Sequence, residues 1–133
     1  MIGLIAVEEE KKLLDKLLAY YKKLYPGVEF EVEERQLTHK ELGEIYYTYA
    51  GEEIEATAQE KMRSISSAIT HGYSTPVIIL KSNSKLILLD GHRRIRVAYA
   101  QGLGWSAYII KPKKEVEFGI ESMVMGKVSD LYG

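Results

Sequence analysis

The first third of the chain carries a helical hydrophobic pattern followed by a strand-like one. From about residue 7 to residue 25, apolar side chains recur every three or four positions, which predicts an amphipathic helix. Three glutamates open this segment and two lysines close it, an order that complements the helix dipole, and Pro26-Gly27 ends it. Residues 28–33 alternate apolar and acidic side chains, which predicts a half-buried strand. The apolar stripe of the helix consists of Leu13, Leu14, Leu17, Leu18, Tyr21 and Leu24.

The pattern is weaker over residues 36–55. Thr38 is followed three residues later by Glu41, the spacing of a capping box, which favours the start of a short helix. Residues 45–49 are rich in aromatic side chains and are compatible with a strand or a helix. A second helical stripe then ends at His71-Gly72, where glycine is typical of a helix C-terminus. This stripe consists of Ala58, Met62, Ile65 and Ile69.

Two short apolar runs follow, over residues 77–80 and 86–89. They flank the polar segment 81–84 and predict a buried β-hairpin. A helix between Asp90-Gly91 and Gly102, a strand over residues 105–110 and a surface turn at 111–114 come next. Residues 115–133 are ambiguous, with a candidate helix over 120–125. We therefore expect residues 1–133 to form a single α/β (α+β) domain, with a short mixed sheet flanked by helices.

Composition limits the classes of function. The 133 residues suit one domain with one core, and a net charge of −1 gives no global attraction toward DNA or an anionic membrane. The lack of cysteine excludes disulfides, thiolate zinc sites and cysteine-based catalysis.

No stretch has the length of a membrane span and no leader peptide opens the chain, so we expect a cytoplasmic protein. The abundance of Glu, Lys, Ile and Tyr suggests a thermophilic source. His39 and His71 are isolated in sequence, so no metal site is predicted.

The segment Asp90-Gly91-His92-Arg93-Arg94 carries the most specific chemistry. It joins a buried strand to a helix, and the first amides of a helix lack partners within it. Gly91 permits a sharp turn and the close approach of a ligand, while the next three side chains add hydrogen-bond donors. Such a turn predicts a phosphate site. The alternative is structural: Asp90 caps the helix and the arginines face solvent. Arginines at this position oppose the helix dipole, which costs some stability unless an anion or an acidic partner compensates.

This segment and its surroundings resemble the ParB N-terminal/sulfiredoxin-like superfamily. The resemblance covers residues 28–111 and rests on the order of elements as well as on the Gly-His-Arg signature. Residues 112–133 would form a C-terminal extension. The matching residues are Ile69-Thr70-His71-Gly72, Thr75-Pro76-Val77-Ile78-Ile79, Leu86-Ile87-Leu88-Leu89-Asp90-Gly91-His92-Arg93-Arg94, Ala98 and Gly102-Leu103-Gly104.

The resemblance implies a small domain that holds nucleotide phosphates at this turn. Members of the superfamily include partition proteins that use CTP, sulfiredoxin, which uses ATP, and an archaeal free-serine kinase, which uses ADP. If the roles of the superfamily's signature residues are carried over to this sequence, Gly91, His92 and Arg93 would contact phosphates. Arg94 stands where partition proteins also have arginine. We therefore expect ATP, ADP or CTP with Mg²⁺ as the ligand, and a phosphotransferase or nucleotidase as one outcome.

Catalysis would require further groups. The resemblance gives Asp90 the role of positioning magnesium or an acceptor hydroxyl, and His92 is a second candidate beside it. Phosphoryl transfer to an alcohol also needs a carboxylate that orients or deprotonates the hydroxyl. Glu41 is the preferred candidate, and the alternative for any such glutamate is a solvated surface charge. The other glutamates of the same region are Glu34, Glu44, Glu52 and Glu53.

Several departures keep other functions open. Sulfinic-acid reduction is excluded because Gly91 stands where sulfiredoxin has its cysteine. The segment after residue 111 is too short for the DNA-binding and dimerisation regions of partition proteins. A DNA-associated regulator or nuclease remains an alternative if the arginines of the signature and the lysines at 111, 113 and 114 form one basic stripe. A non-catalytic regulatory domain is the third interpretation, and a homodimer is compatible with each of the three.

Overall fold

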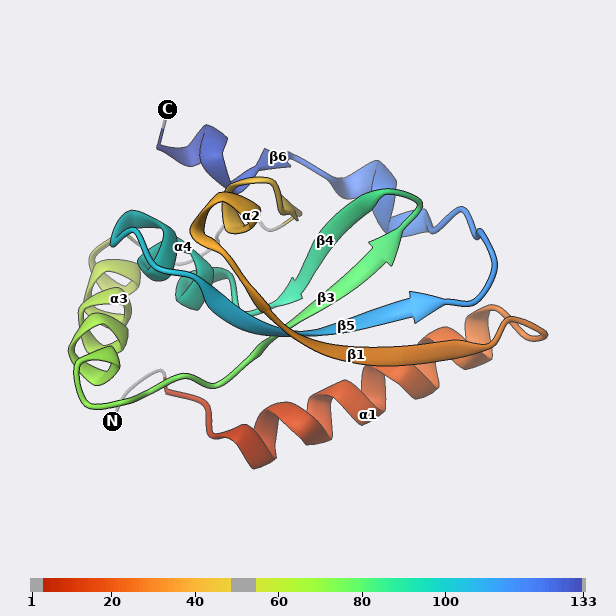
Figure 1. Ribbon diagram of the computed structural model, residues 1–133, viewed down its shortest axis with the longest axis horizontal. Helices are drawn as coiled ribbons and strands as arrows, with labels where there is room; N and C mark the ends of the chain where they lie inside the picture. Colours follow the sequence, from red (N-terminus) through yellow and green to blue (C-terminus); the bar gives the residue numbers. More distant parts are fainter. Residues whose placement is uncertain (1–3, 49–54, 133) are drawn as a thin grey trace.

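The computed structural model describes residues 4–48 and 55–132, without the side chains of residues 55–58 (Figure 1). Its helices and strands alternate along the chain except at the predicted hairpin of β3 and β4. The helices are α1 (Val7–Leu24), α2 (His39–Gly43), α3 (Glu55–Ile69) and α4 (His92–Ala100), with 3₁₀ helices η1 (Gly119–Met123) and η2 (Val128–Leu131). The strands are β1 (Phe30–Leu37), β2 (Tyr46–Tyr47), β3 (Val77–Ser82), β4 (Lys85–Asp90), β5 (Trp105–Pro112) and β6 (Gly126–Lys127).

Within the described residues the strands form one mixed sheet in the order β1-β5-β3-β4-β2-β6. β3 lies parallel to β5, and β2 lies parallel to β4, whereas the other neighbouring pairs are antiparallel. The ends of β3 and β4 that are joined by the hairpin therefore lie beside the carboxyl end of β5. The opposite end of the sheet, where β4 finishes and β5 begins, carries α4. This confirms the predicted α/β class with a short mixed sheet.

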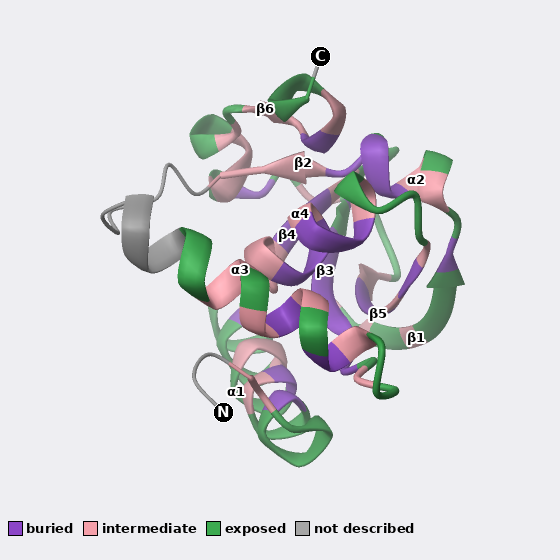
Figure 2. Cartoon of the chain, turned by 90° about the vertical axis from the view of Figure 1, so that its left-hand side faces the viewer, coloured by how far each residue is buried: buried purple, intermediate pink, exposed green. Residues whose placement is uncertain are grey.

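Helices cover the two faces of the sheet unequally. α1 packs along one face, where its buried side chains Leu14 and Tyr21 meet Ile78, Tyr108 and Phe118 (Figures 1 and 2). The other face is covered by α2, α4 and the C-terminal segment, and α3 packs against α4. This second cluster contains Leu37, Leu42, Ile45, Val77, Ile79, Leu88, Ile95, Ala98, Trp105, Ala107, Ile109 and Val128.

The predicted helix boundaries hold where local signals are strong. α1 begins and ends as its stripe and flanking charges predict, and Thr38 caps α2 by accepting a hydrogen bond from the Glu41 amide at 3.2 Å. α3 contains the second stripe, with Ile65 buried, although the side chain of Ala58 lies outside the described residues. Among the described helices none has the length and apolar character needed to cross a membrane.

Strand boundaries differ more from the prediction. The first strand runs over Phe30–Leu37 rather than residues 28–33, because its pairing with β5 continues to Leu37 opposite Trp105. The hairpin turn shortens to Asn83 and Ser84, with Asn83 at a positive φ of 57°. β5 continues through Pro112 into the predicted surface turn. The ambiguous C-terminal segment forms η1, β6 and η2, and its Val128 enters the core beside α2.

Candidate functional site

The turn between β4 and α4 is built by Gly91. This residue has φ 106° and ψ 27°, a left-handed conformation that glycine adopts without strain. A Cβ atom at this position would lie 2.3 Å from Cγ1 of Val77, far inside van der Waals contact. Glycine is therefore required here by the packing of β3 against the turn as well as by the backbone conformation. The chain passes directly from Asp90 at the end of β4 to His92 at the start of α4.

Arg94 points into the protein rather than toward solvent. Its Nη2 donates to Oε2 of Glu10 at 2.6 Å and to Oδ2 of Asp90 at 3.0 Å, and its Nη1 donates to the carbonyls of Thr75 and Pro76 at 3.1 and 2.8 Å. The Arg94 side chain is 4% exposed and the Glu10 side chain 0%. This cluster ties α1, β4 and α4 to the segment that leads into β3. It is the acidic compensation that an arginine in the first turn of a helix requires.

Burial perturbs the acid of this cluster. Desolvation, followed by the neighbouring Asp90 carboxyl, raises the pKa of Glu10 from 4.5 to about 7, while Arg94 opposes the rise. Burial thus opposes the ionised form of Glu10, and the Arg94 guanidinium 2.6 Å away supports it. The Asp90 side chain is 29% exposed and accepts its hydrogen bond from Arg94 on the inner side. The structure thus gives Asp90 a positioning role toward Arg94.

His92 occupies the first position of α4 and is half-buried. Its pKa is lowered from 6.5 to about 4, mainly by burial and also by the neighbouring Arg93 and Arg96, while the Asp90 carboxylate opposes the shift. The imidazole is therefore neutral at physiological pH. In that state it carries one N–H donor and one acceptor, and it adds no positive charge to the turn.

Arg93 and Arg96 lie one helical turn apart on α4. Positions three apart share a face of a helix, and both side chains are half-buried, unlike the inward-facing Arg94. Nε of Arg96 is buried and has no hydrogen-bond partner among the described residues. The main-chain carbonyl of Arg96 accepts a hydrogen bond from Tyr132 at 2.9 Å, so the C-terminal segment lies against this part of α4. The guanidinium groups of Arg93 and Arg96 thus place two positive charges in the first half of α4.

The structure does not bring Glu41 to this turn. Glu41 lies in α2. The first residue of this helix, His39, forms a 3.0 Å hydrogen bond between its Nε2 and the carbonyl oxygen of Tyr99, near the end of α4. Glu41 also shares a cavity with Lys85, the first residue of β4. Tyr99 lies seven positions after His92, or roughly 10 Å along the helix axis. Glu41 therefore belongs to a helix that contacts the C-terminal part of α4 rather than Asp90 and the start of α4.

The environment of Glu41 favours its ionised form. Its Oε1 accepts a hydrogen bond from the Thr38 amide at 2.9 Å, and its Oε2 lies 3.7 Å from Arg35. The Thr38 amide, as the main cause, and Arg35 lower the pKa of Glu41. This carboxylate caps its own helix, and the lowered pKa makes it a weaker base than an unperturbed glutamate.

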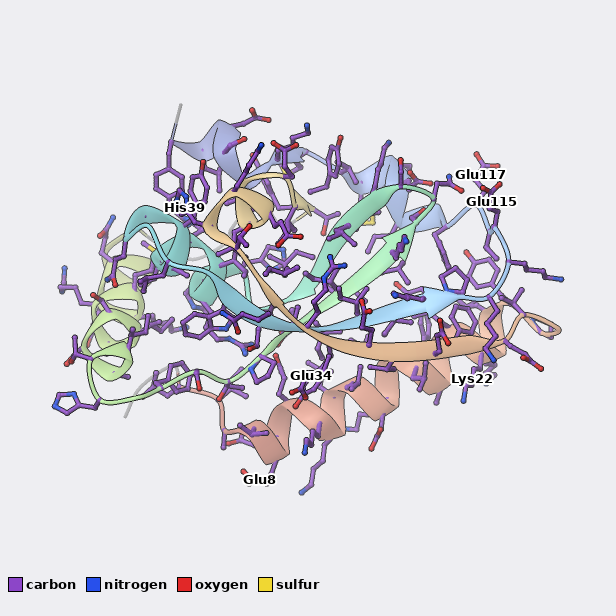
Figure 3. All side chains as sticks on the ribbon, viewed as in Figure 1. Glu8, Lys22, Glu34, His39, Glu115 and Glu117 are labelled. Carbon is purple, nitrogen blue, oxygen red and sulfur yellow. The ribbon has the colours of Figure 1, made fainter. Side chains whose placement is uncertain are left out.

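The remaining candidates are also dispersed. Glu34 lies on the α1 side of β1, remote from His39 on the opposite side (Figure 3). Glu44 pairs with Lys127 at 2.9 Å. Glu52 and Glu53 fall outside the described residues. The basic stripe considered for DNA does not form either, because Arg94 is buried and residues 111–114 lie at the carboxyl end of β5, at the end of the sheet remote from α4.

Sequence reasoning missed Glu10, which it treated as one of three glutamates that complement the helix dipole. Glu10 lies four positions before Leu14 and seven before Leu17, so it continues the apolar stripe of α1 toward the N-terminus. An acidic residue on the buried stripe of a helix indicates a buried cationic partner. That partner, Arg94, is 84 residues away, and the pairing itself could not be read from the sequence.

No family model, curated protein or solved structure matches this chain.

Proposed function

We propose that this protein binds a nucleotide through its phosphates at the start of α4, with Gly91, His92 and Arg93 in contact with the phosphate oxygens. The observation that carries the proposal is the left-handed Gly91, which turns β4 directly into α4 and places the first amides of the helix at the end of a buried strand. Amides and the helix dipole at such a position favour an anion.

The arrangement of cations supports the same proposal. Arg93 and Arg96 lie on one face of α4, and no acidic residue occupies the first turn of this helix. Arg94 is committed to Glu10, Asp90 and two carbonyls, so the proposal assigns it no phosphate contact. Its role would be to hold the turn in place while Arg93 binds. The resemblance to the ParB/sulfiredoxin-like superfamily points to ATP, ADP or CTP as the ligand.

The proposal is for binding, without a phosphoryl-transfer step. Glu41 lies in α2, which contacts the C-terminal part of α4, and Asp90 is paired with Arg94. In the described part of the chain no group of three or more histidine or acidic residues could hold a metal ion, so Mg²⁺ would arrive as the nucleotide complex. These placements favour a binding or regulatory domain over a kinase.

A thermal-shift panel of ATP, ADP, CTP and GTP with Mg²⁺ tests the proposal. We expect at least one nucleotide to raise the melting temperature of the native chain and of Lys22→Ala, at the far end of α1 (Figure 3). The shift should be lost in Arg93→Ala. The absence of a shift with every nucleotide, or an equal shift in Arg93→Ala, would refute the proposed site.

A further inference from the structure

A second cationic surface lies at the end of the sheet remote from α4. Beyond Ile79, Leu88 and Ile109, no helix of the described residues covers the face that carries α2 and α4. A hollow of about 180 Å³ opens there. We call this surface the open sheet face and define it by the residues that line the hollow: Arg35, Lys81, Ser84, Leu86, Ile109 and Lys111.

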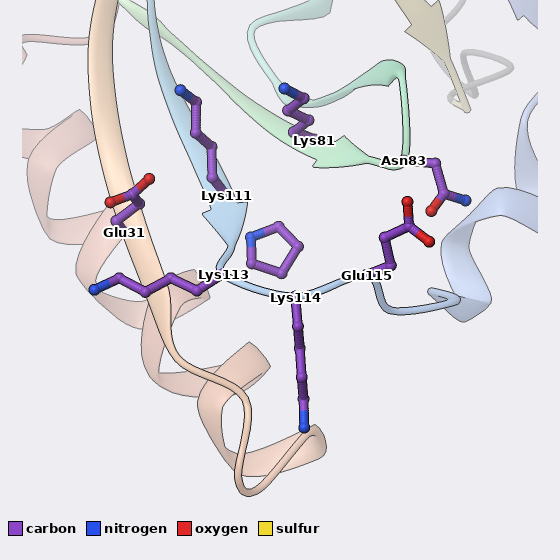
Figure 4. A pocket seen from close by; sticks show the side chains of 8 residues that line it. Glu31, Lys81, Asn83, Lys111, Lys113, Lys114 and Glu115 are labelled. Atoms are coloured by element: carbon purple, nitrogen blue, oxygen red, sulfur yellow. The ribbon is translucent and has the colours of Figure 1, made fainter.

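Strand register brings the cations together. β3 and β5 run parallel with Ile79 opposite Ile109, so two positions further Lys81 and Lys111 are neighbours on the same face. Figure 4 shows both lysine side chains extending to the same side of their strands, while Lys114 extends in a different direction. Like charges on adjacent strands repel one another, so this placement has a cost unless an anion offsets it.

The carboxylates nearby compensate only part of this charge. Glu33 lies 3.1 Å from Nζ of Lys111 and 3.7 Å from Arg35, and Glu41 lies 3.7 Å from Arg35. No carboxylate of the described residues forms an ion pair with Lys81, although this lysine is exposed and stands beside Lys111. Glu31, the register partner of Lys111, and Glu115 line the adjoining cavity with both lysines and form no ion pair with either. Lys81 is thus the cation of the hollow that lacks an ion-pair partner among the described residues.

The floor and walls of the hollow suit an organic anion. Buried Ile109 and half-buried Leu86 form an apolar floor, and Ser84 adds a hydroxyl group. Two wider cavities continue from it. One, of about 620 Å³, shares Lys81 and Lys111, and the other, of about 560 Å³, shares Ser84 and Leu86. An anionic group in the hollow could therefore carry an organic part over the adjoining sheet.

We propose that the open sheet face binds the phosphate group of a small phosphorylated molecule, with Lys81 and Lys111 as its main ligands and Arg35 at the edge. The hollow is too small for more than a compact group, and clustered cations with a hydroxyl donor match phosphate oxygens. This site stands at the opposite end of the sheet from Gly91. It does not depend on nucleotide binding there.

Inorganic phosphate is the first probe, followed by glycerol 2-phosphate, with acetate as the carboxylate control. Amide spectra of the ¹⁵N-labelled chain would be titrated at constant ionic strength. We expect saturable shifts at Lys81, Ser84 and Lys111 with both phosphates, and tighter binding of the organic one. Lys81→Gln should weaken the affinity about tenfold, whereas Lys114→Gln, on the rim of the neighbouring cavity, should change it by less than about twofold.

The titration separates this site from its alternatives. Absence of saturable shifts, equal weakening by Lys114→Gln, or acetate binding as tightly as phosphate would overturn the proposal. A single-stranded oligonucleotide that binds much more tightly than either phosphate, with Lys113→Gln and Lys114→Gln as damaging as Lys81→Gln, would overturn it in favour of a polyanion surface. Arg93→Ala should leave these titrations unchanged, so the test stands apart from that of the nucleotide site.

Discussion

Two arginines in this protein each lie between two carboxylates, yet their surroundings are opposite. Arg94 contacts Glu10 at 2.6 Å and Asp90 at 3.0 Å, and its side chain is 4% exposed. Arg35 lies 3.7 Å from both Glu33 and Glu41, and its side chain is 42% exposed. The first arrangement joins α1, β4, α4 and the segment before β3 in the interior. The second lies on the surface of an edge strand.

The difference between the two clusters is one of dielectric environment rather than of composition. In the interior, a charge that loses its partner is desolvated and uncompensated, so each member of the Arg94 cluster constrains the others. At the surface, water and salt screen the same contacts, and they contribute little to stability. A surface cation therefore remains available to a ligand, while a buried one is part of the fold. Four predictions test this contrast.

The largest effect is expected from Arg94→Leu. This substitution removes the cation and leaves Glu10 and Asp90 facing each other in the interior, along with two carbonyls that lose their donor. We expect the free energy of unfolding to fall by about 3 to 5 kcal/mol, as measured by urea denaturation. The double variant Glu10→Leu/Arg94→Leu should regain a large part of the loss. If Arg94→Leu costs no more than Arg93→Leu, the assignment of a structural role to Arg94 is wrong.

The second largest effect is expected at Gly91, in the turn between β4 and α4 that adjoins the Arg94 cluster. Gly91→Ala places a methyl group against Val77 and forces alanine into a left-handed backbone, so we expect a loss of about 2 to 4 kcal/mol. Gly72→Ala is the matched control, because Gly72 has φ 92° and its Cβ would meet nothing within 4 Å. Thermal unfolding of both variants separates the backbone term from the steric one. Equal losses would show that contact with Val77 contributes nothing.

The third prediction is a pair of opposed pH dependences. Between pH 4.5 and about 7, folded Glu10 keeps a proton that the unfolded chain releases, so this group makes the protein less stable as pH rises. Between about pH 4 and 6.5, unfolded His92 holds a proton that the folded state lacks, so this group makes the protein more stable as pH rises. The two contributions offset each other in the native chain.

Single substitutions should reveal each contribution by urea denaturation across pH 4 to 7. We expect Glu10→Gln to gain stability as pH rises toward 6.5, through His92 alone. His92→Asn should lose about 1 to 3 kcal/mol as pH rises from 4.5 to 7, through Glu10 alone. The double variant should be nearly independent of pH in this window. Identical slopes in the two single variants would contradict the assignment of both pKa shifts.

The smallest effect is expected from Arg35→Gln. It breaks contacts with two carboxylates, as Arg94→Leu does, but those carboxylates stay hydrated when the arginine is gone. We expect the free energy of unfolding to change by less than about 1 kcal/mol, and the change to shrink further in 0.5 M salt. A loss comparable to that of Arg94→Leu would erase the contrast between the two clusters.

The sequence predicts local features of the fold well and distant pairings poorly. The stripe of α1, the capping box at Thr38 and the β3–β4 hairpin all depend on residues within a few positions of one another, and each is present. The strand over residues 30–37 extends beyond its alternating segment because β5, some seventy positions later, supplies its partner. The family resemblance remains a prediction.

The candidate site shows the same division. Its local part, a glycine between a strand and a helix, follows from the order of residues. The distinction between Arg93 and Arg94 does not, since it depends on which side of α4 faces Glu10. The expected catalytic pairing of Glu41 with Asp90 is absent from the structure because α2 packs near the end of α4 rather than its start. Proximity in three dimensions decided each of these points.

The strand order places β1 and β6 at the two borders of the sheet, where unpaired backbone groups could recruit strands from other molecules. β6 spans only Gly126–Lys127, too short to template an added strand. β1 spans eight residues and carries charged side chains at Glu31, Glu33, Glu34 and Arg35. A second copy of β1 that docked on this border would bring a second row of charges against the first, so these charges oppose edge-to-edge pairing between copies of this chain.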